Sequence, residues 1–169
     1  ALDKSLPPRV RVAALEVIQS DPCRKNIKQA ALQILRDQVE DSELRIKAYL
    51  AVVECPCDNV VKTISNLLEN EPIIQVGSFV VSHLKNLQAS TDPSKAEAKE
   101  KLGQLKPKKI FSSDIRKYSQ NYELSYAIDA INAGASVESN VIFSQSSYMP
   151  RSVSLNLTAD VFGHSYNVF

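Results

Sequence analysis

A short helical pattern that occurs three times limits the fold of this chain more than any other feature. The copies are Arg11–Ile18, Arg45–Val52 and Gln75–Ser82, whose first residues lie 34 and 30 residues apart. At one corresponding position the copies carry bulky apolar residues, Leu15, Tyr49 and Phe79. Two more periodic apolar segments lie between the copies, so the repeating unit is a helix pair of the size found in helical solenoids. Because one pair cannot bury its apolar faces alone, the sequence predicts that the copies stack.

Apolar periodicity, prolines and capping residues predict where the helices lie. We expect helices over residues 8–19, 24–38, 42–53, 58–70, 72–87 and, with a more polar sequence, 95–105. Pro107 marks the point where the helical period ends. The predicted domains are therefore a helical-repeat domain over residues 1–106, and a linker with the first strands of a sheet over residues 107–169.

Beyond residue 107 the apolar period changes from 3.6 to 2, the period of a strand with two different faces. In residues 152–162 the apolar positions are Val153, Leu155, Leu157, Ala159 and Val161. An earlier strand is expected over Val137–Phe143. The predicted fold class is therefore α+β, an α-solenoid of stacked helix pairs followed by antiparallel amphipathic β-strands. The apolar face has two interpretations, packing against protein or cover by lipid, and we expect the polar face to lie in water.

The three cysteines lie near predicted helix ends. Cys23 opens one helix, and Cys55 and Cys57 close the next. If these helices are antiparallel neighbours, a bridge from Cys23 to either Cys55 or Cys57 fits disulfide geometry and indicates an oxidising compartment. The alternatives are three reduced thiols in a cytosolic protein, or a metal site with His83. The metal site lacks a fourth ligand at metal spacing, so we expect none.

The charge and the reactive side chains argue against several classes of function. The net charge is +1, which gives no general attraction to nucleic acid. The segment Lys95–Lys117 is locally basic, which fits either a cell-surface receptor or sulfated polysaccharide contact, or a solvated helix end and linker. His83 and His164 lie far apart in sequence and no glycine-rich phosphate loop occurs, so we expect neither an enzyme nor a cofactor.

One sequence motif suggests a modification. Asn156-Leu157-Thr158 is an N-glycosylation sequon, and Asn156 falls on the polar face of its predicted strand. A glycan there would not enter the core. Combined with paired cysteines, the motif favours a secreted protein. The chain lacks an initiator Met and any apolar run of about 20 residues, so we expect a piece of a longer protein without a membrane-spanning helix.

Several segments together resemble a known family. They are Cys23-Arg24, Arg45–Leu50, Cys55-Pro56, residues 116–119, Asn121-Tyr122, Asn140–Phe143 and Tyr148–Arg151. This set resembles the junction of the helical domain and the first lipid-facing sheet in the large lipid transfer proteins, which include vitellogenins, apolipoprotein B, microsomal triglyceride transfer protein and insect apolipophorins. The similarity is strongest to the apolipophorin branch, through Asn121–Ala135 and residues 153–163.

The resemblance implies a fragment of a secreted, glycosylated lipoprotein subunit that carries diacylglycerol and phospholipid through haemolymph. It implies a disulfide between Cys23 and Cys55, with Cys57 as the odd thiol. Lipids are the expected cargo, the remainder of the same chain is an expected partner, and a cell-surface receptor is a possible one. The residues expected to face lipid are Val153, Leu155, Leu157 and Val161.

Two other functions compete with the lipid carrier. An intracellular helical-repeat scaffold would bind protein partners along its concave surface, and it predicts reduced cysteines, no glycan and helix beyond Pro107. A yolk storage protein of the vitellogenin type would share both the helical repeats and the strands. This fragment hardly separates a yolk protein from a circulating carrier.

Overall fold

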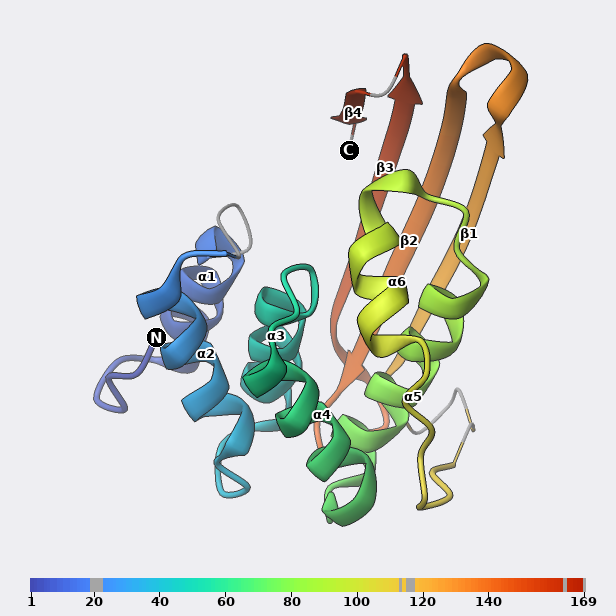
Figure 1. Ribbon diagram of the computed structural model, residues 1–169. Helices are drawn as coiled ribbons and strands as arrows, with labels where there is room; N and C mark the ends of the chain where they lie inside the picture. The colour runs from blue at the N-terminus through green and yellow to red at the C-terminus, as the bar shows by residue number, and fades with distance from the viewer. Residues whose placement is uncertain (19–22, 113, 115–117, 163, 169) are drawn as a thin grey trace.

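The computed structural model describes residues 1–18, 23–112, 114, 118–162 and 164–168. Helices occupy the first part of the chain and a sheet the second (Figure 1). The helical elements are α1 (Pro8–Ile18), α2 (Lys25–Arg36), α3 (Ser42–Val53), α4 (Asp58–Asn70), α5 (Ile74–Ala89), the short 3-10 turn η1 (Pro93–Lys95) and α6 (Ala96–Leu102). The strands are β1 (Gln120–Ile128), β2 (Ala133–Phe143), β3 (Pro150–Val161) and β4 (His164–Asn167), with a 3-10 turn η2 (Asp129–Ile131) between β1 and β2.

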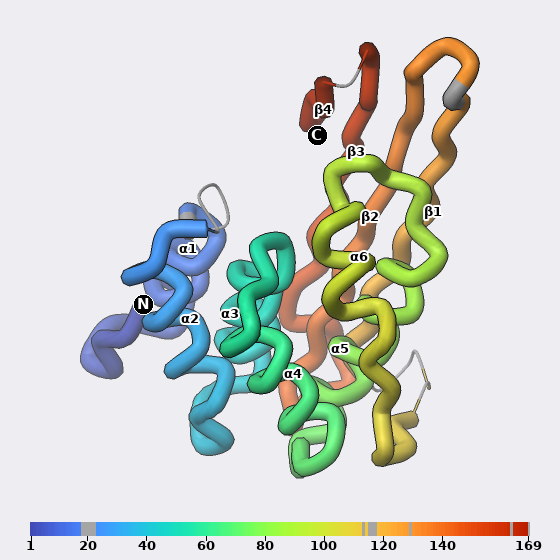
Figure 2. The backbone as a smooth tube through the Cα atoms, in the orientation of Figure 1, coloured from blue at the N-terminus to red at the C-terminus, as the bar shows by residue number. Residues whose placement is uncertain are grey.

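The three repeat copies fall on α1, α3 and α5, which pack in that order as one layer. The even-numbered helices form a second layer, as the smooth trace in Figure 2 shows. The matching residues Leu15, Tyr49 and Phe79 are all fully buried. The repeated helix pair is therefore the structural unit of the first domain, and the predicted α-solenoid is confirmed.

Helix α3 is the most buried element, because it packs on both neighbours in its own layer, on α2 and on strand β2. All twelve of its residues are buried, polar ones included. Asp41 caps the helix by accepting a hydrogen bond of 3.0 Å from the backbone N–H of Glu43. Arg45 forms a bidentate ion pair with Glu71, at 2.8 and 2.5 Å, so its buried charge is paired.

The Arg–Glu pair recurs in the repeat. Arg11, at the position equivalent to Arg45, forms a bidentate pair with Glu40, whose Oε1 lies 3.0 Å from Arg11 Nη1. In both pairs the Arg is on the first helix of a unit, and the Glu follows the second helix. A buried pair left without one partner costs about 3–5 kcal/mol, so these pairs hold the stacking in register.

The sheet is antiparallel with strand order β1-β2-β3-β4. Its register pairs Leu124 with Val137 and Val137 with Leu157, so residues on one face form rows across the strands. A register shift at Ile142 and Phe143 lets both of these residues be buried, and Ile142 joins the helical core. One end of the sheet is thus packed against the helices, and its other end extends past them (Figure 1).

Strands beyond Pro107 contradict the helical scaffold, which requires continued helix there. The expected strand over Val137–Phe143 begins earlier, at Ala133, and the expected final helix ends at Leu102, three residues before the predicted position. Strand β1 was not predicted. The predicted end of the first helix at residue 19, the residues up to 22 and the final Phe169 lie outside the described residues.

Candidate functional site

One face of the sheet, called here the outer face, points away from the helices and is mostly apolar. It carries Tyr122, Leu124, Tyr126, Ile128, Val137, Val153, Leu155, Leu157, Val161 and Tyr166. Each of these side chains is at least 36% exposed, and Leu124 reaches 76%. No other described residue covers this face. An exposed apolar patch continuous over four strands is typical of an interaction site rather than of a free surface.

The four residues expected to face lipid all lie on the outer face. Val153, Leu155, Leu157 and Val161 are 64%, 49%, 36% and 41% exposed. The interpretation that this face packs against protein is not what the described residues show.

The opposite face, called here the inner face, is polar and lies against the helices. Asn86 on α5 donates hydrogen bonds to the carbonyl and side-chain oxygens of Asn121, at 2.8 and 2.7 Å. After α5, the backbone N–H of Thr91 donates to the Ser125 hydroxyl at 2.8 Å. On β1 the polar face is therefore not in water, because groups of α5 and the following turn hydrogen-bond to it, whereas on β3 Asn156 of the same face is exposed.

Lys95 links the helical layer to two strands at once. Its Nζ lies 2.9 Å from Glu123 Oε2 on β1 and 2.7 Å from Glu138 Oε2 on β2. Glu123 also accepts a hydrogen bond of 2.6 Å from the Ser90 hydroxyl, and Glu138 accepts one of 2.8 Å from Asn121 Nδ2. Burial alone would lower the pKa of Lys95, but the two carboxylates outweigh burial and raise it above its ordinary value. We call these three charged residues the Lys95 clamp.

Asn156 lies on the inner face, opposite the apolar residues that flank it. It is exposed and lines a cavity between the sheet and the helices. The sequon is therefore accessible from the helix-facing side of the sheet and not from the outer face.

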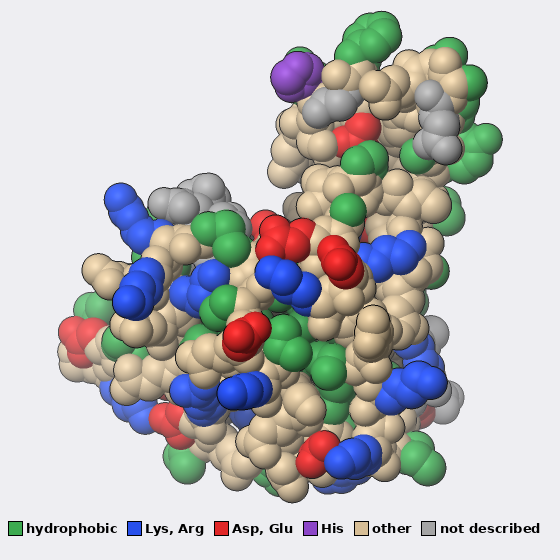
Figure 3. Space-filling view, in the orientation of Figure 1, with side chains coloured by type: hydrophobic (Ala, Val, Ile, Leu, Met, Phe, Trp, Pro, Cys, Tyr) green, Lys and Arg blue, Asp and Glu red, His purple; other side chains and the backbone are tan. Residues whose placement is uncertain are grey.

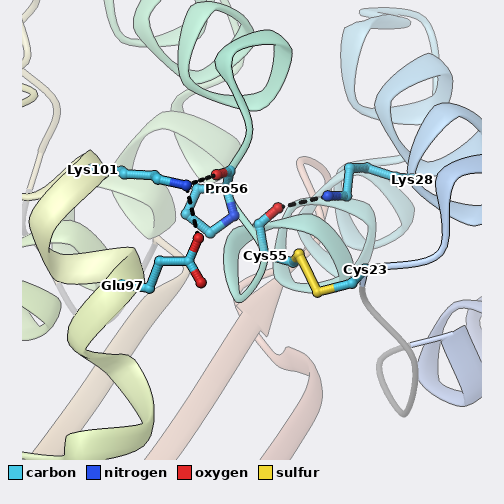
Figure 4. The surroundings of a disulfide bond; sticks show 6 residues. All are labelled: Cys23, Lys28, Cys55, Pro56, Glu97 and Lys101. Atoms are coloured by element: carbon cyan, nitrogen blue, oxygen red, sulfur yellow. Dashed lines mark hydrogen bonds and ion pairs between the residues drawn. A yellow bond between two sulfur atoms is a disulfide. The ribbon is translucent and has the colours of Figure 1, made fainter.

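A disulfide joins Cys23 to Cys55 (Figure 4), with 5.4 Å between the Cα atoms. Cys57 is free and exposed. This is the pairing that the family resemblance implies. Around it, Lys28 donates to the carbonyl of Cys55 at 2.9 Å and Lys101 to that of Pro56 at 3.0 Å. These contacts fix the loop between α3 and α4 against both α2 and α6.

The basic run after Lys95 is partly used inside the molecule. Lys108 pairs with Glu69 at 2.6 Å, and Lys109 donates to the carbonyl of Glu71 at 2.7 Å. Residues 115–117 of this run lie outside the described residues. On the face in Figure 3, basic and acidic side chains are mixed over the helices and form no single basic surface.

Two kinds of site are absent from the part of the chain that the structure describes. It contains no cluster of three or more His, Cys, Asp or Glu side chains that could hold a metal ion. None of its helices is long and apolar enough to cross a membrane. His83 is buried, and its Nδ1 lies 2.8 Å from the Tyr49 hydroxyl, so it has a structural partner.

Sequence reasoning missed the whole of β1 and the Lys95 clamp. A signal for β1 was available, since Tyr122, Leu124, Tyr126 and Ile128 alternate with more polar residues. The clamp had no such signal, because its members are 28 and 43 residues apart along the chain.

Comparison with known proteins finds a family model for each half of the chain. The model of the vitellogenin TPR domain matches residues 1–85, and the model of the vitellinogen open beta-sheet matches residues 117–169. Apolipophorins of Locusta migratoria are 99% identical over 169 residues, and those of Manduca sexta 49% over 168 residues. The chain spans 5% of the length of each of these relatives.

Human apolipoprotein B-100 is a more distant relative, 28% identical over 182 aligned residues, or 95% of this chain and 4% of that protein. A solved structure titled as lipid–protein interactions in lipovitellin matches with a TM-score of 0.82 and 24% identity, over 99% of this chain and 18% of that one. This likeness confirms the fold. With the two domain models in the same order as the helices and the sheet, the chain belongs to the vitellogenin family of large lipid transfer proteins, as its sequence motifs imply.

Proposed function

We propose that this chain is part of a lipid carrier, and that the outer face of its sheet contacts the carried lipid. The observation that supports this most directly is the continuous apolar surface that no described residue covers. Fully burying a Leu side chain stabilises by about 1.5–3 kcal/mol. Leu124, at 76% exposed, would therefore gain about 1–2 kcal/mol from contact with lipid.

In this proposal the inner and outer faces of the sheet have different roles, and neither role needs a catalytic group. Hydrogen bonds and ion pairs fix the inner face to the helices, so the outer face is held open rather than collapsed onto the protein. The proposed cargo is diacylglycerol and phospholipid, with no cofactor. The rest of a longer chain would complete the lipid cavity, because a four-stranded sheet cannot enclose one.

We also propose that the protein is secreted into haemolymph, where a cell-surface receptor would be a further partner. The Cys23–Cys55 disulfide supports an oxidising compartment. Yolk storage, as the name vitellogenin indicates for a relative from Penaeus merguiensis that is 35% identical over 158 residues, would use the same outer face. The similarity of 99% to apolipophorins of Locusta migratoria favours the circulating carrier.

Photo-crosslinking on the intact lipoprotein tests the proposal. A photoreactive residue is placed at Leu155 on the outer face, and in a matched variant at Ser154, the adjacent inner-face position. We expect lipid adducts from position 155 and far fewer from position 154. Equal labelling of both positions, or labelling mainly from position 154, would refute the assignment of the outer face to lipid.

A further inference from the structure

A pocket of about 230 Å³ lies at the margin of the sheet, between α5, the start of β1 and the segment after α6. Phe111 of that segment packs against Gly77, where α5 has no side chain, and with Val81 it forms an apolar wall of the pocket. Tyr122 also lines the pocket and belongs to the outer face, where it is 45% exposed. The pocket therefore adjoins the surface that contacts lipid in the proposed function.

The described residues of this pocket offer hydrogen-bond donors and no carboxylate. The only charge among them is the ammonium of Lys85, which is exposed and forms no hydrogen bond or ion pair with a described residue. Ser112 accepts a hydrogen bond of 3.2 Å from the backbone N–H of Asp114, so its own O–H remains to donate. A cation together with hydroxyl donors is suited to bind a phosphate or a similar anion.

Gln120 gives a second, independent indication of a ligand in this pocket. It is only 9% exposed, it lines the pocket, and no described residue hydrogen-bonds to its side-chain amide. Leaving a buried amide without a partner is destabilising, so such groups are rare in native proteins and call for a water or a ligand. The Gln120 amide therefore supplies a further donor that is free to bind a guest in the pocket.

We propose that this pocket binds the phosphate group of a phospholipid whose acyl chains lie on the outer face. The phosphate oxygens accept hydrogen bonds from Lys85, Gln120 and Ser112. The hydroxyl of Tyr122, to which no described residue hydrogen-bonds, donates to an ester oxygen of the lipid glycerol. This inference rests on the proposed function, since the acyl chains need the outer face, and it adds the class of lipid and the place of its head group.

The apolar residues beside the pocket favour a lipid over a free phosphate ion. Leu124 lies two residues beyond Tyr122 on the same face of β1, about 7 Å along the strand, and is 76% exposed. Val137 and Leu157 continue its row across the next two strands. A phosphate in the pocket thus has a surface for its own acyl chains next to it. Diacylglycerol has no phosphate and would leave the donors of the pocket without an acceptor.

Photo-crosslinking on the intact full-length lipoprotein tests this placement. Two phosphatidylcholines are exchanged into the particle, one with a photoreactive head group and one with the photoreactive group at the end of an acyl chain. The head-group probe should label peptides of α5 and of the segment around Ser112, and the chain probe should label peptides of β2 and β3. If the chain probe labels the strands but the head-group probe labels only other regions, the outer face still binds lipid and the pocket assignment is overturned. If neither probe labels the sheet, the proposed function itself fails, and this inference fails with it.

Lys85→Met isolates the contribution of the charge. The side chain is exposed, so the substitution should not disturb the fold. Head-group labelling of the α5 peptide should fall about tenfold or more, since a hydrogen bond to a charged group contributes at least that factor. The matched control is Lys62→Met, which removes an exposed lysine of α4 that also has no described partner and should leave the labelling unchanged. Equal head-group labelling of wild-type protein and Lys85→Met would overturn the proposal.

Competition separates a bound lipid from a free anion. A short-chain phosphatidylcholine should displace the head-group probe about tenfold or more effectively than inorganic phosphate, because only the lipid also covers apolar side chains of the outer face. Equal displacement by the two competitors would show a general anion site and overturn the assignment to phospholipid.

Discussion

The Lys95 clamp should decide how firmly the sheet is fixed to the helices, and Lys95→Met tests this. The substitution keeps the length of the aliphatic side chain but removes the charge. It leaves Glu123 and Glu138 without their cation, although their side chains are only 1% and 16% exposed. Breaking a buried ion pair costs about 3–5 kcal/mol. Since the Lys95 side chain is itself 19% exposed, the lower value of about 3 kcal/mol applies.

Hydrogen exchange on the full-length lipoprotein measures this cost locally. A loss of about 3 kcal/mol should speed exchange in the β1 and β2 peptides about 100-fold, because each 1.4 kcal/mol is a factor of ten. Helix α2 should be unaffected. The control is Lys108→Met, which breaks an exposed pair with Glu69 and should change no exchange rate measurably.

A second substitution checks the reason for the effect. Adding Glu138→Gln to Lys95→Met removes one of the two unpaired carboxylates, so part of the lost protection should return. If the β1 and β2 amides of Lys95→Met exchange within about twofold of the wild-type rate, the clamp does not hold the interface, and hydrogen bonds such as those of Asn86 do.

Three more substitutions test the helical layer. Arg45→Met leaves Glu71 buried without its partner and should destabilise the α3 and α5 region by about 3–5 kcal/mol, measured by hydrogen exchange in those helices. Gly77→Ala places a Cβ where the ring of Phe111 lies, so it should cost about 1–3 kcal/mol and speed trypsin cleavage in the linker after α6. Burial lowers the pKa of His83, so as the pH falls below 6.5 the unfolded state takes up a proton before the folded state does. The free energy of unfolding should therefore decrease from pH 6.5 down to the folded-state pKa, by up to about 1.4 kcal/mol per pH unit. His83→Gln should abolish this part of the pH dependence, measured by denaturant unfolding at several pH values.

Local sequence signals were sufficient for most of the helical part. Helices α3 and α4 begin and end where capping residues and prolines predict, at Ser42–Val53 and Asp58–Asn70. The largest difference is at α6, where the helix ends at Leu102 and Gly103 is the C-cap residue. The sequence allowed a disulfide from Cys23 to either Cys55 or Cys57, and the packing of the helices brings Cys23 next to Cys55. Such a choice depends on distances in space that spacing along the chain does not contain.

The candidate site was predicted only in part. The alternation of apolar and polar residues along a strand defines its two faces, but it does not show which face packs against the helices. Shifting β3 by one residue would turn Leu155 toward the helices and Ser154 outward, with the same alternation of apolar and polar residues. Among the described residues, no protein packs on the apolar face and the polar face meets the helices. The information lay in the helices, since α5 and the following turn present polar groups, among them Asn86, Ser90 and Lys95, to the sheet.

The polar interface explains why the apolar face is left uncovered. If the sheet were turned over, Glu123 and Glu138 would lose Lys95 and their hydrogen bonds, and the polar groups of α5 would face apolar side chains without partners. Each buried polar group without a partner costs about 1–3 kcal/mol. The gain from covering a half-exposed Leu is about 1 kcal/mol. The polar residues on the inner face thus fix the orientation of the sheet, and the apolar residues of the outer face are left for a partner outside the described residues.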